Sequence, residues 1–284
     1  MNARCRVVVL TFNCEDIIGQ TLAQARRIDP RPLVVDSHST DGTLREVGPE
    51  AEVLQRAFSN YADQRNWAMA QLLQTEPPPE WQLHLDADEV LDDEAVLAIQ
   101  QVLQAGDAAA HRAYLLRRVD YFMGRRLRHS GLNPWHLRLF RSGEAACEQR
   151  LYDQHFVSPH RAGRLPGSMH DKNAVSLKDW VSRHNRWSDL EAEEMRLALA
   201  AAPASGRLQP RLQGDPRERT RWLKALYYRM PSGLRALAYF VYRYVFRLGF
   251  LDGREGLYFA FLQGLWFRLL VDAKMHEARQ ADRR

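Results

Sequence analysis

The chain has 284 residues, 45% of them hydrophobic, and a formal net charge of +5. This length fits one large catalytic domain with an appendage. A positive balance suits anionic lipids or phosphate-bearing substrates, and nucleic acid is excluded as a partner because no recognised binding motif accompanies the basic residues. Cys5, Cys14 and Cys147 are too scattered for a zinc site and indicate a reducing compartment.

The N-terminal segment predicts a strand, a polar loop and a helix. The strand is the β-branched run Val7–Leu10, and apolar residues at helical spacing follow from Ile18. Three loop residues, Thr11, Phe12 and Asn13, lie between strand and helix. Because the strand begins almost at once, we expect no secretory signal peptide before it.

The same order of elements repeats in the next segment. A strand at Leu33–Asp36 is followed by a polar loop, Ser37–Thr43, and by a short helix that begins near Leu44. This alternation predicts an α/β fold with a mostly parallel sheet. Ligands of such sheets bind outside the carboxyl ends of the strands, where Asn13, Asp36, Asp41 and Asp86 would converge.

An apolar run, Trp81–Leu85, predicts a further strand that ends in the triplet Asp86-Ala87-Asp88. Two carboxylates at the exit of a strand would form a site for Mg²⁺ or Mn²⁺, since these cations accept oxygen ligands. Mg²⁺ is usually held by one or two carboxylates together with substrate phosphates, so the site suits a nucleotide diphosphate. In the alternative interpretation, Asp88 and Glu89 are solvated turn residues that open the next helix.

Together these segments resemble the family 2 glycosyltransferases, which have the GT-A fold. The loop Thr11–Asn13 is similar to the first-strand loop of that family, Asp36–Thr43 to its DxxSxDGT motif, and Asp86–Asp88 to its metal-binding triplet. The resemblance implies that Asp36 binds the base of a nucleotide and that Asp41 lies near it. It also implies that Asp88, with Asp86, holds the metal that bridges the diphosphate.

The fragment Ser59–Ala68 begins a predicted helix, which carries Arg65 and Asn66. These two residues resemble the pair that the family places beside the donor nucleotide. An arginine in that place could pair with phosphate through its fixed fork of donors. The alternative is an exposed helix arginine without a role in binding.

Two more strands are predicted at Ala113–Leu116 and His136–Phe140, and the basic, aromatic stretch between them could wall the acceptor site. Beyond them, relatives usually carry an acidic residue as catalytic base, and Asp153 is the residue we predict. Inverting transfer needs a carboxylate that takes the proton of the acceptor hydroxyl as this hydroxyl attacks the anomeric carbon. Glu148 is the alternative, because the sequence lacks the more common ED or HE pair.

The family resemblance also implies a histidine that completes the metal site. His170 lies at about the expected position, and Asp171 is the substitute. An imidazole nitrogen suits Mn²⁺ better than Mg²⁺. The cofactor is therefore expected to be a divalent metal, Mn²⁺ or Mg²⁺.

A long helix is predicted to begin after Ser176, which has the form of a capping box with Asp179. Its apolar side contains Leu177, Trp180, His184 and Trp187. Three acidic residues, Glu191, Glu193 and Glu194, indicate an exposed face. The Pro-, Gly- and Arg-rich segment 203–221 is typical of a linker or a mobile loop.

The C-terminal residues 222–284 mix aromatic and aliphatic side chains with arginines. Neither of their two apolar runs predicts a transmembrane span, because a spanning helix needs about 20 mostly apolar residues. Rings interspersed with arginine are typical of helices that lie in a membrane interface. The alternative is a helical hairpin packed on the domain or on a second subunit.

The sequence thus predicts a GT-A catalytic domain at 1–202, a linker at 203–221 and an amphipathic, membrane-associating helical region at 222–284. The expected enzyme is an inverting, metal-dependent glycosyltransferase with a nucleotide-sugar donor, first of all a UDP-sugar, and a saccharide or lipid-linked saccharide acceptor. We expect it on an anionic membrane surface at the cytoplasmic face of the bacterial inner membrane, in lipopolysaccharide or exopolysaccharide synthesis. The alternatives are a nucleotidyltransferase, whose phosphate loop is missing after the first strand, and a non-catalytic nucleotide-binding scaffold.

Overall fold

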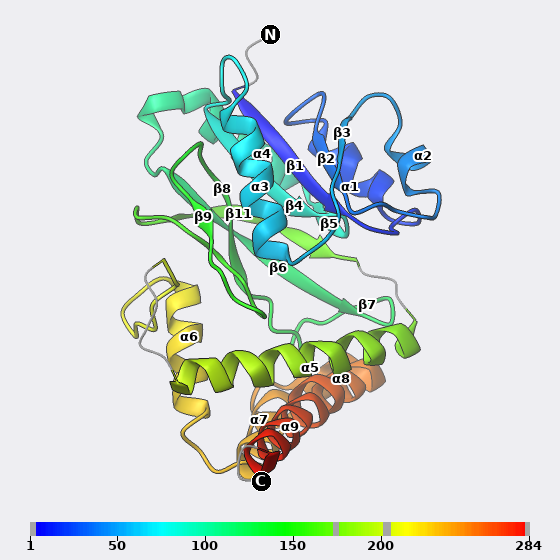
Figure 1. Cartoon of the computed structure of the whole chain (residues 1–284), viewed down its shortest axis with the longest axis vertical. Helices are drawn as coiled ribbons and strands as arrows, with labels where there is room; N and C mark the ends of the chain where they lie inside the picture. Colours follow the sequence, from blue (N-terminus) through cyan, green and yellow to red (C-terminus); the bar gives the residue numbers. More distant parts are fainter. Residues whose placement is uncertain (1–3, 173–175, 201–205, 282–284) are drawn as a thin grey trace. The chain divides into compact units, whose positions relative to one another are not determined.

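The computed structural model describes residues 4–172, 176–200 and 206–281 (Figure 1). Contacts within the chain divide it into two compact units. The first is drawn from the residues up to Val119, Asn133–Gln149 and Gln154–Lys172, and the second from Asp120–Leu132, Arg150–Asp153 and the described residues beyond 175. The predicted catalytic domain 1–202 stays a prediction, since these units divide the chain at other positions.

The first unit alternates strands and helices, as the sequence predicted. Its elements are β1 (Cys5–Thr11), α1 (Ile18–Ala25), β2 (Leu33–Asp36), α2 (Thr43–Val47), β3 (Glu52–Gln55), α3 (Tyr61–Leu73), β4 (Trp81–Asp86), β5 (Glu89–Leu91), α4 (Asp93–Ala105), a 3₁₀ turn (Gly106–Ala108), β6 (Ala113–Phe122), β8 (Trp135–Arg141), β9 (Ala146–Cys147), β10 (Phe156–Val157) and β11 (Gly163–Asp171). The predicted α/β class is confirmed.

The main sheet has the strand order β3-β2-β1-β4-β8-β6-β11-β5. Its first four strands are parallel, and β8 joins β4 in the antiparallel direction. In this register Thr11 lies beside Asp36, and Leu10 lies beside Asp86. Three polar strand ends therefore meet at one edge of the sheet.

Strand β1 is apolar from Val7 to Leu10 because both of its faces are covered there. Val7 and Val9 belong to the core cluster that includes residues of α1 and α4, whereas Val8 and Leu10 pack with residues of α3. Successive side chains of a strand point to opposite faces, so a run of valines fills two cores at once. Burial of each such side chain stabilises the fold by roughly 1.5–3 kcal/mol.

The second unit is mainly helical. Its elements are β7 (Arg125–Arg126), which pairs with the end of β6, α5 (Leu177–Ala200), α6 (Pro216–Tyr227), α7 (Leu234–Val241), a π-helical turn (Tyr242–Phe246), a 3₁₀ turn (Gly249–Asp252), α8 (Gly253–Phe259), a second π-helical segment (Ala260–Trp266) and α9 (Phe267–Ala281). Residues 206–215 form neither helix nor strand. Helix α6 begins within the predicted linker, behind a capping box of Asp215 and Glu218.

Helix α5 presents its aromatic side as predicted. The Ser176 hydroxyl accepts a hydrogen bond from the backbone N–H of Asp179 at 3.1 Å, which caps the helix. The rings of Trp180 and His184 stack at 3.5 Å, and Trp187 packs near Tyr152. These rings form part of the core of the second unit.

The predicted exposed face of α5 is wrong for two of its three glutamates. Glu191 and Glu194 are each only 2% exposed. Glu191 pairs with Lys224 at 2.7 Å and with Arg268 at 3.0 Å, and Glu194 pairs with Arg207 at 2.8 Å. The acidic run therefore binds cations that the sequence places far downstream, because burial of a carboxylate requires a partner charge.

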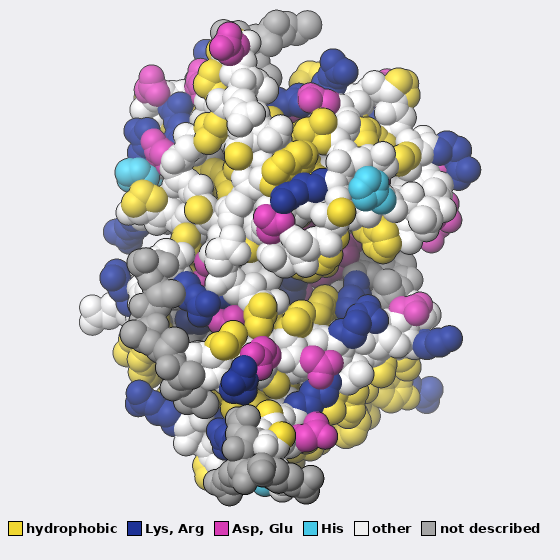
Figure 2. Space-filling model, viewed as in Figure 1, with side chains coloured by type: hydrophobic (Ala, Val, Ile, Leu, Met, Phe, Trp, Pro, Cys, Tyr) yellow, Lys and Arg dark blue, Asp and Glu magenta, His cyan; other side chains and the backbone are white. Residues whose placement is uncertain are grey.

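No helix within the described part of the chain is long and apolar enough to cross a membrane. The second unit nevertheless exposes many large apolar side chains, in a region where helices are short and interrupted. Figure 2 shows hydrophobic side chains gathered at its lower right.

Candidate active site

The triplet Asp86-Ala87-Asp88 leaves β4 at the edge where β1 and β2 also end. The backbone N–H of Ala87 donates to the carbonyl of Leu10 at 3.0 Å, and the buried Thr21 hydroxyl of α1 donates to the Ala87 carbonyl at 2.7 Å. Both bonds hold the middle residue of the triplet. The turn that carries the two carboxylates is thus fixed from the strand side and from the helix side.

The loops after β1 and β2 are bonded to each other through side chains. The Asn13 carboxamide oxygen accepts from the N–H of Thr40 at 2.8 Å, and the Ser39 hydroxyl accepts from the N–H of Asn13 at 2.9 Å. The Thr43 hydroxyl accepts from the N–H of Cys14 at 2.7 Å. Asn13 has a positive φ of 49°, a conformation that asparagine tolerates better than most residues. The two predicted donor loops therefore form one bonded surface, and Phe12 stands out from it with 55% of its side chain exposed.

Asp36, predicted to bind the base of a nucleotide, is fully buried at the end of β2. Its carboxylate accepts from the N–H of Ser39 at 3.0 Å, from the Ser39 hydroxyl at 2.5 Å and from the Gln55 amide at 3.0 Å. The carboxylate thus orders the loop that follows it. A nucleotide base that donates to Asp36 would have to replace one of these three donors.

Asp41 lies in the same loop and is exposed. Its carboxylate accepts from the hydroxyl and the N–H of Thr43, at 2.5 and 3.0 Å, and from the N–H of Glu15 at 3.3 Å. Desolvation alone would raise the pKa of Asp41, but these hydrogen bonds outweigh it and lower the pKa. Asp41 is therefore a fixed negative charge that closes the second loop onto the first.

Asp86 is the centre of an ion-pair network. One guanidinium nitrogen of Arg65 donates to both of its carboxylate oxygens, at 2.8 and 3.0 Å, and Arg138 donates at 3.2 Å. Burial alone would raise the pKa of Asp86, yet the two arginines hold it well below its usual range. The alternative of an exposed helix arginine is wrong, because Arg65 is only 7% exposed.

Glu89 and Arg138 belong to this network and were missed by the sequence reasoning. Glu89 is 2% exposed, accepts from Arg138 at 2.5 Å and accepts from the N–H of Asp86 at 3.0 Å. Burial raises the pKa of Glu89, against the pull of Arg138. Since Glu89 begins strand β5, its interpretation as a solvated residue that opens a helix is wrong. An arginine inside the apolar run of β8 was the signal available in the sequence.

Asn66, the second residue of the predicted pair on α3, binds backbone rather than a ligand. Its carboxamide accepts from the N–H of Cys147 at 2.8 Å and donates to the Cys147 carbonyl at 3.0 Å. Arg65 and Asn66 together tie α3 to the end of β4 and to β9. The pair therefore fixes the backbone that surrounds the site.

Asp88 lies in the turn between β4 and β5 and is half-buried. Its carbonyl accepts from the N–H of Lys172 at 3.0 Å, which joins the turn to the end of β11. Burial is the main cause that raises the pKa of Cys14, and the Asp88 carboxylate adds to it. Asp88 is therefore close enough to the loop after β1 to act on the charge of Cys14.

His170 and Asp171 lie side by side on β11, opposite Val90 and Glu89 of β5. The imidazole of His170 is 3.5 Å from the carboxylate of Asp92, and Asp171 is 3.7 Å from Arg118. Within the described residues, no three His, Cys, Asp or Glu side chains lie close enough together to hold a metal by themselves. The predicted ligands Asp86, Asp88 and His170 are thus not gathered into a metal site by the protein alone.

The two candidate bases belong to different units. Glu148, in the first unit, is 2% exposed and accepts from the N–H of His155 at 3.0 Å. Asp153, in the second unit, has a positive φ of 58° and its carboxylate is 3.4 Å from the ammonium group of Lys224. Its side chain is 36% exposed. The carboxylate of Asp153 is therefore more accessible to an acceptor than that of Glu148.

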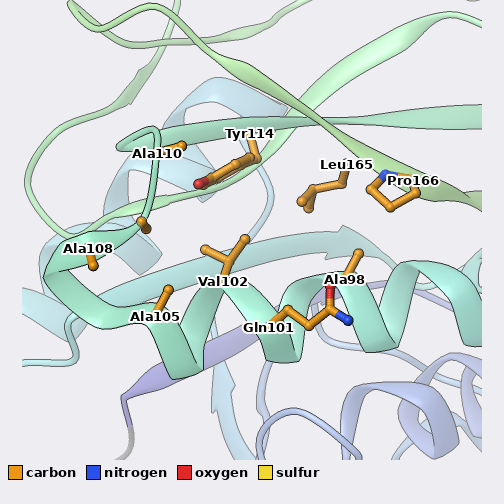
Figure 3. Close-up of a pocket in the computed structure, with 10 residues that line it drawn as sticks. Ala98, Gln101, Val102, Ala105, Ala108, Ala110, Tyr114, Leu165 and Pro166 are labelled. Atoms are coloured by element: carbon orange, nitrogen blue, oxygen red, sulfur yellow. The ribbon is translucent and has the colours of Figure 1, made fainter.

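A shallow pocket of about 230 Å³ lies between α4 and the strands β6 and β11 (Figure 3). Tyr114, Leu165 and Pro166 face Ala98 and Val102 across it. Among the described residues that line it, none has a carboxylate, imidazole, amine or thiol side chain. This pocket contains none of the predicted site residues.

Comparison with known proteins places these features in a family. The family model described as "Glycosyl transferase family 2" matches residues 6–165. This range contains β1 to β4 and the triplet with all the loops described above. No curated protein sequence matches the chain significantly.

Two solved structures are similar along nearly the whole chain. The mannosyltransferase PcManGT from Pyrobaculum calidifontis, in complex with GDP-Man and Mn²⁺, is 15% identical with a TM-score of 0.48, over 96% of this chain and 86% of that one. Residues 1–349 of TarS from S. aureus are 16% identical with a TM-score of 0.41, over 98% and 91%.

Proposed function

The chain belongs to glycosyl transferase family 2, and we propose that it is an inverting, metal-dependent enzyme that uses a nucleotide-sugar donor. The observation that supports this proposal best is the meeting of Thr11, Asp36 and Asp86 at one sheet edge. Ligands of parallel α/β sheets bind at that edge. The donor, first of all a UDP-sugar, would lie over the bonded loops.

The donor nucleotide would be positioned by the residues that order these loops. Asp36 is proposed to accept from the base and Asp41 to hold the loop beside it, with Thr11, Phe12 and Asn13 on the other side. Arg65 would share its guanidinium between Asp86 and the donor diphosphate. A guanidinium shared between a carboxylate and a nearby phosphate remains fully charged.

The proposed cofactor is a single Mn²⁺ or Mg²⁺. Asp88 offers oxygen ligands of the type that both cations accept, whereas Asp86 is engaged with two arginines. The metal would therefore depend on the diphosphate of the donor for much of its coordination, as Mg²⁺ commonly does. His170, or Asp171 in its place, is the proposed additional ligand. The metal would supply stabilisation of the charge on the leaving diphosphate.

In the proposed step, the acceptor oxygen bonds to the anomeric carbon as the bond from this carbon to the phosphate oxygen breaks. The electron pair leaves with the nucleoside diphosphate, and a carboxylate takes the hydroxyl proton. Asp153 is the proposed base, because its carboxylate is the more exposed of the two candidates. Lys224 would then have to release it when the acceptor hydroxyl approaches. Glu148 is the alternative base.

The acceptor is proposed to be a saccharide on a lipid carrier, at the cytoplasmic face of the bacterial inner membrane. Support comes from the second unit, which exposes large apolar side chains although it contains many charged ones. Exposed apolar patches of soluble proteins usually mark an interaction surface. The proposed product would enter a lipopolysaccharide or an exopolysaccharide. Family membership favours this function over a nucleotidyltransferase or a non-catalytic scaffold.

The proposal is tested by thermal unfolding of the full chain with a panel of nucleotide sugars, each with and without Mn²⁺. A ligand that binds only the folded state stabilises it by about 2.7 kcal/mol at 100 times its Kd. We expect one nucleotide class to raise the Tm, and only in the presence of the metal. Release of the nucleoside diphosphate is then measured with that donor. If no nucleotide sugar changes the Tm, the donor site is misassigned.

A further inference from the structure

A basic hairpin from the middle of the chain belongs to the helical unit. Residues 120–132 include the short pair of β6 and β7, in which Tyr121 and Phe122 lie opposite Arg126 and Arg125. Phe122 is buried beside Phe259 of α8, with ring centroids 5.3 Å apart. Met123, at the tip, is 58% exposed. The Phe122 ring therefore anchors the hairpin on α8, while Met123, Arg125, Arg126 and Arg128 are exposed to solvent.

The carboxylate of Asp252 accepts most of the hydrogen bonds that hold the return segment of the hairpin, and that of Asp120 accepts one from the N–H of Leu132 at 2.7 Å. Asp252 is 3% exposed and accepts from the N–H groups of Arg128, His129 and Ser130, at 3.1, 2.9 and 2.7 Å, and from the Ser130 hydroxyl at 2.8 Å. The fully buried Arg243 donates to the Ser130 carbonyl. These bonds fix the position of the hairpin relative to the 3₁₀ turn and α8.

Large apolar side chains are exposed on two consecutive turns, the π-helical turn that ends at Phe246 and the 3₁₀ turn that contains Asp252. Phe246 is 74% exposed, Leu251 is 53% exposed and Phe250 is 47% exposed. Figure 2 shows such side chains gathered in the region that α8 occupies in Figure 1, with Lys or Arg side chains at their border. Apolar side chains this large and this exposed bury little area in the described fold, so they are available to a partner.

Three of the four arginines around these turns have no carboxylate partner among the described residues. Arg126, Arg128 and Arg254 are exposed, and no ion pair is formed by them within the described residues. Arg125 pairs with Glu255 at 3.3 Å, which keeps the hairpin beside α8. Apolar side chains at the centre and unpaired guanidinium groups at the border therefore share one surface, which we call the basic apolar face.

We propose that the basic apolar face docks on an anionic lipid surface, with Phe246, Phe250, Leu251 and Met123 in the interface and the arginines at the headgroups. Interfacial binding combines buried apolar area with electrostatic attraction to anionic lipid. Arginine matches a phosphate headgroup through its fork of donors. The inference rests on the proposed membrane association, not on glycosyl transfer, and it adds the hairpin 120–132 to the C-terminal helices as part of the membrane contact.

The positive charge of the basic apolar face favours anionic lipid over a second copy of the chain as its binding partner. A twofold contact between copies places the same patch on both sides, so the unpaired arginines of one copy would approach those of the other. Like charges in such a contact oppose association. An anionic surface neutralises all of them at once.

Flotation with vesicles of phosphatidylglycerol and of phosphatidylcholine tests the proposal on the full chain. Removal of each arginine should weaken binding to the anionic vesicles about fivefold, so R126Q/R128Q/R254Q should weaken it about 100-fold. The matched control R31Q/R161Q/R164Q removes three exposed arginines of the first unit and should retain wild-type binding. F246Q/L251Q should also lose binding, without a change in net charge.

Two further measurements separate the possible outcomes. Equal loss in both triple-arginine variants would overturn the proposal, since only net charge would then matter. Sedimentation measures the oligomeric state of the wild type and of F246Q/L251Q. If the wild type is a dimer and F246Q/L251Q is a monomer, the face is a subunit interface and the proposal is overturned. Calorimetric titration of UDP with Mn²⁺ is independent of lipid. Flotation without UDP binding would therefore contradict the donor site alone, and UDP binding without flotation would contradict the membrane face alone.

Discussion

One nitrogen of the Arg65 guanidinium donates to both carboxylate oxygens of Asp86, at 2.8 and 3.0 Å. This contact joins α3 to the end of β4, between residues that are 21 positions apart. The first carboxylate of the triplet is thereby neutralised before any ligand binds. The pair holds the turn, and the second carboxylate, Asp88, is the more available of the two proposed metal ligands.

The first prediction follows from this division of roles. Asp86→Asn should lower the free energy of unfolding by about 3 kcal/mol, because it leaves Arg65 and Arg138 buried with less compensating charge. Asp88→Asn, at a half-buried turn, should cost less than about 1 kcal/mol. Urea denaturation of the two isosteric variants makes the comparison. Equal stability of both variants would show that the network does not hold the fold.

The second prediction concerns the metal. Asp88→Ala should abolish the part of UDP binding that depends on Mn²⁺ and keep the far-UV circular dichroism of the native protein. Removal of the proposed ligand leaves the metal with phosphate and water alone, which are ligands that free solution also offers. Calorimetric titration with and without Mn²⁺ measures the difference. Unchanged metal-dependent affinity would reject Asp88 as a ligand, and His170→Ala then tests the other candidate.

The strands and loops of the site were predictable because their signals are local. An uninterrupted apolar run such as Val7–Leu10 indicates a strand covered on both faces, and the polar residues after it mark the ligand edge. The burial of β1 and the register of Thr11 with Asp36 agree with that reasoning. Short-range patterns therefore predict the α/β class and the polar loops at the strand ends, whereas the order of β8, β6, β11 and β5, with its antiparallel pairs, does not follow from them.

The partners of buried charges were not predictable, because they depend on distant parts of the chain. Arg138 is 52 residues from Asp86 and Lys224 is 33 residues from Glu191, so no local spacing relates them. The acidic residues after Trp187 have the composition of an exposed face, yet tertiary packing buries two of them. The hairpin 120–132 likewise gave no sign that its partner is Asp252, since only the folded chain brings them together.

The third prediction concerns the catalytic base. Asp153→Asn should retain UDP binding and lower the transfer rate by roughly 10²-fold or more, since the amide cannot take the acceptor proton. Measurement of kcat and of donor affinity on the same preparations separates chemistry from binding. Glu148→Gln serves as the paired variant. Normal turnover of Asp153→Asn together with an inactive Glu148→Gln would assign the base to Glu148.

The fourth prediction is a pH dependence of stability. Lys224 and Arg268 outweigh burial and lower the pKa of Glu191 to about 2. Because the folded pKa lies below the unfolded value of about 4.3, the carboxylate contributes stability above the unfolded pKa and loses it as the pH falls toward 2. Glu191→Gln should therefore cost roughly 3 kcal/mol at pH 7 and progressively less between pH 5 and pH 2.

Urea denaturation of the wild type and of Glu191→Gln across that range checks the fourth prediction. Glu193→Gln is the matched control on the same helix, because Glu193 pairs only with Arg196 at the surface of α5 among the contacts described. An exposed pair of this kind contributes about 0.3–0.5 kcal/mol. A difference between Glu191→Gln and wild type that does not shrink with falling pH would contradict the linkage.

The fifth prediction links the hairpin to the membrane. Asp252→Ala should raise amide hydrogen exchange at residues 128–130, because it removes the acceptor of three backbone N–H groups. Each buried donor left without an acceptor costs about 1–3 kcal/mol. Vesicle binding should fall as well, although no arginine or apolar side chain of the basic apolar face is changed. Ser130→Ala removes only the hydroxyl bond and should retain both protection and binding, so loss of binding in Asp252→Ala without faster exchange at 128–130 would contradict a positioning role for Asp252.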